Sequence, residues 1–333
     1  MDLWFLKIIK NFEIQNLKSL KHVKLECEKI NLFIGETNVG KSNILESLAF
    51  LSSFYHTKNT EDYQTLFDFL RLEEFANLFY NNSIDEKIVL NLDDKEYVIS
   101  YDNGELQIKN ELSKFSVDFN GFLIASDKNL IDSFKNIKYY NYKYFKAYNG
   151  ENQSKMKENY LYPPYGFNLF DIIYTNSSIR AIVEEIFESE GFRLVFIPKT
   201  KKFVYQKQIE NTIVQFPIVL APDTIQAVLF YEAAIESNSN SIIVFEEPES
   251  HMFPYYVTRM AKKISKDKNN QYFITTHNPY FLGQILSTNI NDLGIFITSV
   301  ENYETKVRKL SKEEIEGTLD LDLLLNLDFD KEK

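Results

Sequence analysis

Nine residues near the amino terminus have the types and spacing that hold a nucleotide's phosphate chain. Residues 35–42 read GETNVGKS and fit the pattern G-x-x-x-x-G-K-[ST]. Glycines let the backbone approach a phosphate closely, and the free N–H groups of a following helix attract negative charge. Lys41 adds a mobile positive charge, and the Ser42 hydroxyl is an oxygen ligand suited to Mg²⁺. The expected phosphate loop comprises Gly35, Glu36, Thr37, Asn38, Val39, Gly40, Lys41, Ser42 and Asn43.

Two adjacent acids end the apolar segment IIVFEE at residues 242–247. In a parallel sheet, ligands bind beyond the carboxyl ends of the strands. One carboxylate can then hold Mg²⁺, usually through water, and the next can orient and deprotonate a water that attacks the γ-phosphorus. A strand that simply ends in solvent can show the same pattern. The functional interpretation is favoured because the chain also has a phosphate loop and because Pro248 predicts a turn directly after the acids.

A histidine ends a further apolar segment, QYFITTH at residues 271–277. His277 can hydrogen-bond a γ-phosphate and report its presence. A single histidine is more often structural, but its place at the end of a neighbouring strand favours the functional interpretation. His251, within PESHMFP, is left open between loop packing and a subunit contact.

The elements that must position these groups can be read from the hydrophobic pattern. A short apolar strand, INLFI, precedes the phosphate loop, and residues 42–51 have helical periodicity after it. In the last third, helices alternate with short apolar strands, which predicts a parallel sheet covered on both faces. The expected elements there are helices 223–237, 255–266 and 280–286 and strands 241–247, 271–277 and 294–300.

The preceding part of the chain reads as a mixture of strands and helices. Residues 102–104, Asp-Asn-Gly, predict a hairpin turn, and Gly191 predicts a helix end. We expect strands at 5–17, 22–27 and 216–220, helices at 58–85 and 167–190, a β-meander at 86–109 and a hairpin at 193–209. Residues 135–146, KNIKYYNYKYFK, interleave lysines with aromatic residues. We interpret them as a strand with a packed aromatic face and solvated lysines, with base stacking on Tyr139, Tyr140, Tyr142 or Tyr144 as the alternative.

Composition limits the class of protein. The 333 residues are 44% hydrophobic and 26% charged, which is typical of a globular chain. A single cysteine excludes a disulfide framework, and no apolar run is long enough to span a membrane. The opening residues do not resemble a signal peptide. These features predict a cytoplasmic protein. The 37 basic and 48 acidic residues give a net charge of −11, so any nucleic-acid contact must be local.

The motifs, in this order, resemble those of an ABC-type ATPase head, and more narrowly those of the OLD/AAA15-like (RecF/SMC-related) AAA ATPase group. The resemblance rests on FEIQNLKSLKHV, GETNVGKSN, FEEPESHMFP and TTHNPYFL. It implies an α/β P-loop NTPase fold that binds ATP and Mg²⁺. It also implies that Glu246 is the Walker B acid, that Glu247 is the catalytic base and that His277 is the switch histidine. Two such heads enclose two ATP molecules, so a homodimer or larger assembly is expected.

Two departures from the group's pattern qualify this expectation. The Ser and Gly of the usual signature are replaced by Ala221 and Asp223. We expect Asp223 to cap a helix and to repel a γ-phosphate presented by a second head, while Thr224 remains able to donate one hydrogen bond. Hydrolysis is then slow or partner-dependent. We expect no long coiled coil in residues 58–215 and no TOPRIM nuclease domain after the head, and the metal-sensing glutamine of many relatives has no evident counterpart.

The expected organisation is a single ABC-type ATPase domain over residues 1–333. It divides into N-terminal strands and phosphate loop (1–57), an inserted α+β lobe with an antiparallel subdomain (58–215), the Walker B and switch-histidine core (216–310) and an acidic tail (311–333). The expected role is a dimerising sensor or scaffold for a separate effector, such as a nuclease, in anti-phage defence. The alternatives are a RecF-like DNA repair ATPase, for which nucleic-acid binding has weak support, and a nucleotide-gated scaffold with little hydrolysis.

Overall fold

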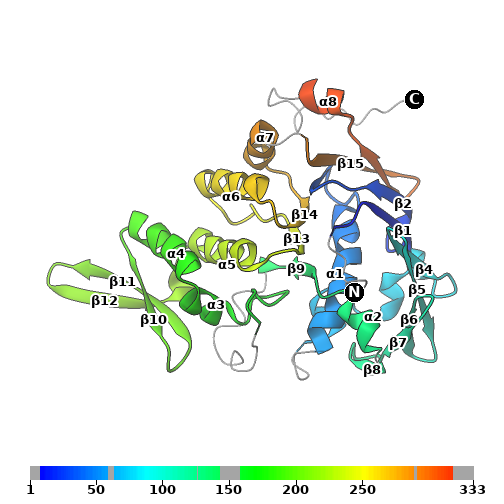
Figure 1. Ribbon diagram of the computed structural model, residues 1–333, viewed down its shortest axis with the longest axis horizontal. Helices are drawn as coiled ribbons and strands as arrows, with labels where there is room; N and C mark the ends of the chain where they lie inside the picture. Colours follow the sequence, from blue (N-terminus) through cyan, green and yellow to red (C-terminus); the bar gives the residue numbers. More distant parts are fainter. Residues whose placement is uncertain (1–7, 59–63, 126, 143–157, 289–290, 318–333) are drawn as a thin grey trace.

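The computed structural model describes residues 8–58, 64–125, 127–142, 158–288 and 291–317. These residues form three β-sheets and the helices that cover them (Figure 1). The helices are α1 (Lys41–Lys58), α2 (Lys128–Asp132), α3 (Leu169–Thr175), α4 (Ser177–Ser189), α5 (Asp223–Ser237), α6 (Pro254–Lys266), α7 (Pro279–Thr288) and α8 (Lys312–Gly317).

One sheet carries the phosphate loop. Its strands are β3 (Ile30–Ile34), β9 (Ile137–Tyr140), β13 (Ile242–Glu246), β14 (Gln271–Thr275), β15 (Leu293–Glu301) and β16 (Glu304–Lys309). Their order is β16-β15-β3-β14-β13-β9, and every neighbouring pair is parallel except the hairpin β15–β16. The expected α/β class with a mostly parallel core sheet is confirmed, because the carboxyl ends of β3, β13 and β14 lie along one edge.

Both faces of this sheet are buried, which explains the continuous apolar runs in the sequence. In β13, Ile243 and Phe245 pack into a core that includes residues of α3 to α7. Ile242 and Val244 point the other way, into a second core that includes residues of α1. The sheet therefore lies between α1 on one face and the later helices on the other (Figure 1).

A second, antiparallel sheet packs on the far side of α1. It is formed by β1 (Asn11–Leu17), β2 (Leu20–Glu26), β4 (Ile88–Leu92), β5 (Lys95–Asp102), β6 (Glu105–Lys109), β7 (Lys114–Val117) and β8 (Leu123–Ala125). The predicted β-meander and its turn are confirmed, with positive φ at Asn103 (51°) and Gly104 (85°) as a tight hairpin requires. The N-terminal strands thus share one sheet with strands from the middle of the chain.

A smaller antiparallel sheet, β10 (Arg193–Ile197), β11 (Lys202–Ile209) and β12 (Thr212–Pro217), extends from α3 and α4 as an arm (Figure 1). It confirms the predicted hairpin at 193–209. The predicted strand at 216–220 is wrong, because β12 ends at Pro217 and residues 218–220 form a 3-10 turn. The arm, α3 and α4 constitute the inserted α+β part of the fold.

The helix predicted over residues 58–85 is wrong. The helix α1 ends at Lys58, and short 3-10 helices at 66–68, 75–78 and 80–82 follow. Polar side chains bond the local backbone instead: Asp68 accepts the N–H of Thr65 (2.7 Å), and Asn77 accepts the N–H of Glu74 (3.1 Å). Such local bonds compete with helix formation, although the apolar spacing resembles that of a helix.

The single helix predicted over 167–190 is instead two helices, α3 and α4. Asn176 separates them, and its side-chain oxygen caps α4 by accepting the N–H groups of Ser178 (3.0 Å) and Ile179 (3.2 Å). The predicted end at Gly191 is confirmed, because its φ of 76° is the left-handed conformation that glycine favours.

Candidate functional site

The phosphate loop turns directly from β3 into α1, and it does so where only glycine fits. Gly35 has a φ of +154°, and a Cβ there would lie 2.2 Å from the carbonyl oxygen of Thr298 in β15. Gly40 has a φ of +94°, and its Cβ would lie 2.1 Å from Oγ1 of Thr305 in β16. The hairpin β15–β16 therefore fixes the loop by close backbone approach.

Lys41 begins α1 with its ammonium folded back over the loop. Its Nζ donates hydrogen bonds to the carbonyl oxygens of Gly35 (2.9 Å) and Glu36 (2.5 Å). Burial lowers the pKa of Lys41, while the nearby carboxylates Glu247 and Glu246 act to raise it. These acids therefore face the lysine across the loop, as the motif spacing predicts.

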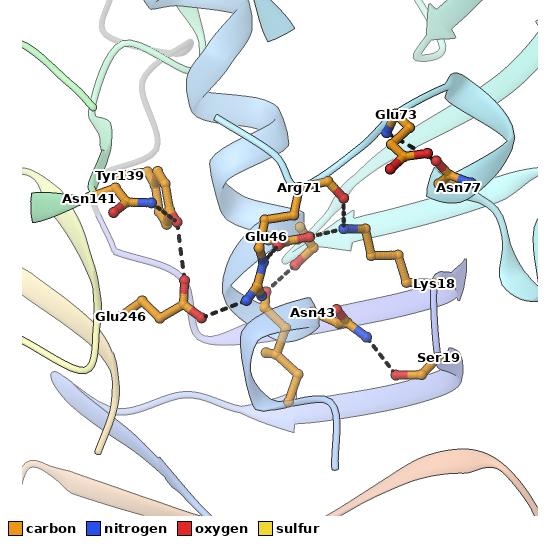
Figure 2. Close-up of polar contacts among 12 residues, drawn as sticks. Lys18, Ser19, Asn43, Glu46, Arg71, Glu73, Asn77, Tyr139, Asn141 and Glu246 are labelled. Carbon is orange, nitrogen blue, oxygen red and sulfur yellow. Dashed lines mark hydrogen bonds and ion pairs between the residues drawn. The ribbon is translucent and has the colours of Figure 1, made fainter. Parts of the chain in front are cut away.

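Glu246, the last residue of β13, is held by partners from two other segments (Figure 2). Its Oε1 lies 3.3 Å from Nη1 of Arg71, and its Oε2 accepts a hydrogen bond from the hydroxyl of Tyr139 (3.4 Å). The carboxylate thus lies at the mouth of the loop with a positive charge beside it.

Glu247 follows in a left-handed backbone conformation, with a φ of 41°. Its N–H points at Thr275 on the neighbouring strand, 3.1 Å from both the carbonyl oxygen and Oγ1. A non-glycine residue in this conformation is strained, and such strain is found at functional sites. In this conformation the Glu247 side chain points toward His277.

His277 lies directly after β14, opposite Glu247. Its Nε2 is 3.2 Å from Oε1 of Glu247, and Ser250 donates a hydrogen bond to the other oxygen of that carboxylate (3.4 Å). Burial and Lys41 lower the pKa of His277, and Glu247 acts in the opposite direction. The imidazole is therefore neutral at pH 7, when it can donate at one nitrogen and accept at the other.

Glu249, a third acid of the FEEPES segment, accepts a hydrogen bond from the backbone of His277 outside the cleft. It is buried, and its Oε1 accepts the hydroxyl of Thr276 (2.6 Å) and the backbone N–H of His277 (3.0 Å). The two strand ends, β13 and β14, are thus joined by a carboxylate that does not itself line the cleft.

The predicted residues meet in a single cleft of about 680 Å³. Gly35 and Glu36 lie behind it and contribute the carbonyl oxygens that accept from Lys41. The predicted residues that line the cleft are Thr37, Asn38, Val39, Gly40, Lys41, Ser42, Asn43, Glu246, Glu247 and His277.

Several lining residues were missed by sequence reasoning. Asn141 follows β9, the parallel neighbour of β13, and so lies at the same edge of the sheet. The strand-end rule would have found it, had β9 been recognised as a core strand. Nothing in the sequence indicates that Arg71 belongs to the site, because the apolar spacing of its segment predicts a helix. The other lining residues not predicted for the site are Ser19, Tyr142, Tyr231, Ser250 and His251.

The segment that replaces the usual signature differs from expectation in two details. Pro222, not Asp223, is the cap residue of α5, and no side-chain cap bond forms there. Thr224 does not project a free donor, because its hydroxyl donates to the carbonyl oxygen of His251 (2.9 Å). That bond, and the packing of His251 against the ring of Tyr142 at 5.3 Å between centroids, favour the loop-packing interpretation of this histidine.

The aromatic and basic segment at 135–146 does not offer stacking platforms in its described part. Tyr139, Tyr140 and Tyr142 are buried, and so is Lys138, against the expectation of solvated lysines. The Lys138 ammonium lies 3.3 Å from the centroid of the Tyr160 ring. Tyr144 lies outside the described residues.

Two further properties concern the described part of the chain alone. None of its helices is both long enough and apolar enough to cross a membrane. No three His, Cys, Asp or Glu side chains within it gather as a metal cluster.

A family model described as "AAA domain, putative AbiEii toxin, Type IV TA system" (AAA_21) matches residues 30–283. This range contains the phosphate loop, Glu246, Glu247 and His277. The chain belongs to the AAA_21 family. With the similarities that follow, the match confirms the resemblance to ABC-type ATPase heads of the RecF/SMC-related group.

This AAA_21 chain is 25% identical over 298 residues to the DNA replication and repair protein RecF of Thermoanaerobacter sp. (strain X514), with 82% of this chain and 72% of the relative covered. A RecF of Thermoanaerobacter pseudethanolicus gives the same values.

Solved structures that resemble the AAA_21 chain include SMC heads. The SmcHead bound to the C-winged helix domain of ScpA has a TM-score of 0.58 at 17% identity, over 93% of this chain and 99% of that one. A Pyrococcus yayanosii Smc head with a coiled coil and joint has a TM-score of 0.55 at 11% identity, over 94% and 99%. These structures confirm the fold.

Proposed function

We propose that this chain is a Mg²⁺-dependent ATPase, whose ATP-bound form dimerises and acts on a separate effector protein. One observation carries the catalytic part of the proposal: the ends of three parallel strands bring Lys41, Glu246, Glu247 and His277 around one cleft. The choice of ATP, rather than another nucleotide, is supported by the match to a family described as an AAA domain.

In this proposal the phosphate loop binds the triphosphate through its N–H groups and Lys41. The Lys41 ammonium already lies over the loop, so it needs only to exchange its two carbonyl partners for phosphate oxygens. Asn43, which donates to Ser19 Oγ at 2.7 Å, ties the start of α1 to the β1–β2 turn and keeps the loop in place.

The residues of the cleft fit a magnesium ion. Ser42 and Glu246 both offer oxygen donors, the ligands that Mg²⁺ prefers, and both line the same cleft. With only two protein donors, the remaining ligands would be water and phosphate oxygens, which is the usual arrangement for this ion. Mg²⁺ supplies neutralisation of the charge on the phosphate oxygens.

Glu247 is proposed as the base that orients the attacking water, and His277 as its partner. In the nucleotide-free chain, the 3.2 Å contact between them lets the single N–H of a neutral His277 donate to Glu247. With ATP bound, that N–H would be donated to a γ-phosphate oxygen instead, which frees the carboxylate to accept from the attacking water. Ser250, 3.4 Å from the other carboxylate oxygen, limits the rotation of the base.

Two biological roles fit this machinery. A cytoplasmic role in anti-phage defence, with an effector such as a nuclease on a separate chain, is supported by the toxin and Type IV TA system in the family description. A RecF-like role in DNA repair is supported by the 25% identity to RecF. Asp223 begins α5, where it would face the second head of the proposed dimer, and the Thr224 hydroxyl is used within the chain. Both features support slow hydrolysis in either role, or a nucleotide-gated scaffold.

The test compares nucleotide binding, turnover and assembly in three chains. Lys41→Ala is expected to weaken ATP binding about tenfold or more, whereas Lys201→Ala, which removes a surface ion pair with Asp171, leaves binding unchanged. Glu247→Gln is expected to reduce turnover by about 10² or more while ATP still binds and drives dimerisation, measured by light scattering. Unchanged turnover in Glu247→Gln would remove Glu247 from its role.

A further measurement separates the two biological roles. Salt-sensitive binding of duplex DNA to the ATP-bound dimer is expected for a repair ATPase. The defence role predicts no such binding at low salt, in agreement with the net charge of −11.

A further inference from the structure

Arg71 links two acids at the border of the phosphate loop, and the function proposed above uses neither link. It lies in the irregular segment between the 3-10 helices at 66–68 and 75–78, with 56% of its side chain exposed. Its Nε lies 2.5 Å from Oε1 of Glu46, and its Nη1 lies 3.3 Å from Oε1 of Glu246 (Figure 2). The guanidinium therefore bridges α1 and β13.

Glu46 is the stronger of the two partners. It lies on α1, one turn beyond Ser42, and only 2% of its side chain is exposed. Lys18, from the β1–β2 turn, also pairs with Glu46, and its ammonium donates to the carbonyl oxygen of Arg71 (3.0 Å). A buried carboxylate with two cations is poorly screened by water, so it holds Arg71 firmly.

Glu246 is the weaker partner, and it is also the acid proposed for Mg²⁺. Its side chain is 21% exposed, and its contact with Arg71 is the longer one. Its second oxygen accepts from Tyr139. Both oxygens of this carboxylate thus have a partner, and a cation that reaches it competes with the guanidinium for the same negative charge.

We propose that Arg71 is a built-in counter-ion of the metal position, which balances Glu246 when no divalent cation is bound and gives way when one binds. This proposal rests on the function proposed above, in which Glu246 helps to hold Mg²⁺. Arg71 yields at Glu246 because the two cations would share one carboxylate and repel each other. It stays beside the site because Glu46 retains it.

Two consequences distinguish this arrangement from a simple surface ion pair. Arg71 lowers the affinity of the site for the metal, because the two cations compete for the charge of Glu246 and repel each other. Glu46 opposes that effect, because it draws the guanidinium toward α1 and away from Glu246. Substitutions at the two positions therefore shift metal affinity in opposite directions, and the effect of Glu46 depends on Arg71.

The experiment titrates Mn²⁺, a spectroscopically detectable substitute for Mg²⁺, into the full-length chain with saturating ADP, and measures free Mn²⁺ by electron paramagnetic resonance. Arg71→Gln is expected to bind Mn²⁺ roughly threefold to tenfold more tightly than the wild type, as loss of a partly exposed ion pair allows. Arg71→Lys keeps the charge without the fork that reaches both acids, so it is expected to bind at least about twofold more tightly. Arg308→Gln is the matched control, because Arg308 has a similar exposure of 62% and one acidic partner outside the cleft.

Glu46→Gln completes the test as a double-mutant cycle. It is expected to weaken Mn²⁺ binding roughly threefold in the wild-type background and to have no effect in the Arg71→Gln background. A wild-type chain that binds Mn²⁺ and ADP, but whose affinity is unchanged in Arg71→Gln and Arg71→Lys, would overturn the counter-ion proposal alone. A wild-type chain that binds neither would overturn the proposed function as well.

Discussion

Nε2 of His277 lies 3.2 Å from Oε1 of Glu247, although 29 residues of chain separate the two and each follows a different strand. The contact exists because β13 and β14 are parallel neighbours whose carboxyl ends lie together. It pairs a carboxylate with an imidazole that burial and Lys41 keep neutral. The electrostatics of this pair can be tested directly.

The titration of His277 should follow the charges around it. In the nucleotide-free chain its NMR midpoint is expected below 6.5, the ordinary value for this side chain, because burial and Lys41 lower its pKa. Glu247→Gln should lower the midpoint further, and Lys41→Ala should raise it. The His277→Asn spectrum identifies the resonance. A midpoint above 6.5 in the wild type would contradict the arrangement described here.

Gly40 should tolerate no side chain, and the chain offers a matched control. Gly40 and Gly104 have similar backbone angles, with φ of +94° and +85°, but an added Cβ meets Thr305 Oγ1 at 2.1 Å in the first case and nothing within 4 Å in the second. Each change to Ala carries a backbone cost of about 1 kcal/mol. Only Gly40→Ala should lose more stability than that, and only Gly40→Ala should lose ATP binding, as measured by thermal unfolding and calorimetry. Equal losses in both variants would show that crowding by Thr305 is unimportant.

Glu249 should act on turnover through His277. Because its Oε1 accepts the N–H of His277, Glu249→Ala is expected to lower kcat about tenfold while KM for ATP changes little. Glu249→Gln retains an oxygen acceptor, so it should recover most of the rate. The measurement is steady-state turnover over a range of ATP concentrations. If Glu249→Gln and Glu249→Ala were equally impaired, the charge of Glu249 rather than its hydrogen bond would be the important property.

The buried ammonium of Lys138 should lower the free energy of unfolding at neutral pH. Its ammonium is buried and has no hydrogen-bond partner among the described residues, and burial lowers its pKa well below 10.5. A pKa lowered on folding makes the free energy of unfolding increase with pH up to 10.5 and decrease as pH falls toward the folded pKa. Lys138→Met should remove this dependence and stabilise the chain at pH 7 by about 1 kcal/mol or more.

The measurement for Lys138 is urea unfolding at several pH values from 7 to 10. Lys109→Met, on an exposed position of β6, is the control and should change stability by no more than about 0.5 kcal/mol. A loss of stability in Lys138→Met would mean that the contact with the Tyr160 ring outweighs the cost of burial.

The elements that carry the chemistry were predictable because their patterns are local. Gly35 to Ser42 form a contiguous motif, and Glu246, Glu247 and His277 each end an apolar strand, so one rule about parallel sheets places them together. The helices α5, α6 and α7 likewise have boundaries within about two residues of those expected. In these regions the periodicity, the turn residues and the tertiary structure agree.

The residues that sequence reasoning missed depend on long-range contacts. Arg71 lies in a segment with helical spacing, but Asp68 and Asn77 bond the local backbone and leave it irregular. Asn141 and Lys138 belong to or follow β9, whose place beside β13 cannot be read from its alternating lysines and tyrosines. Lys138 is buried because both sides of β9 are covered, although alternation predicts a solvated side chain.

The double cover of the core sheet limits how small molecules can reach it. With α1 on one face and α5 to α7 on the other, the cleft opens at the edge where β3, β13 and β14 end. Glu246, Glu247 and His277 lie at that edge, and Lys41 reaches it from the start of α1. A partner that covers this edge would therefore control both nucleotide entry and product release, without contacting the interior of the fold.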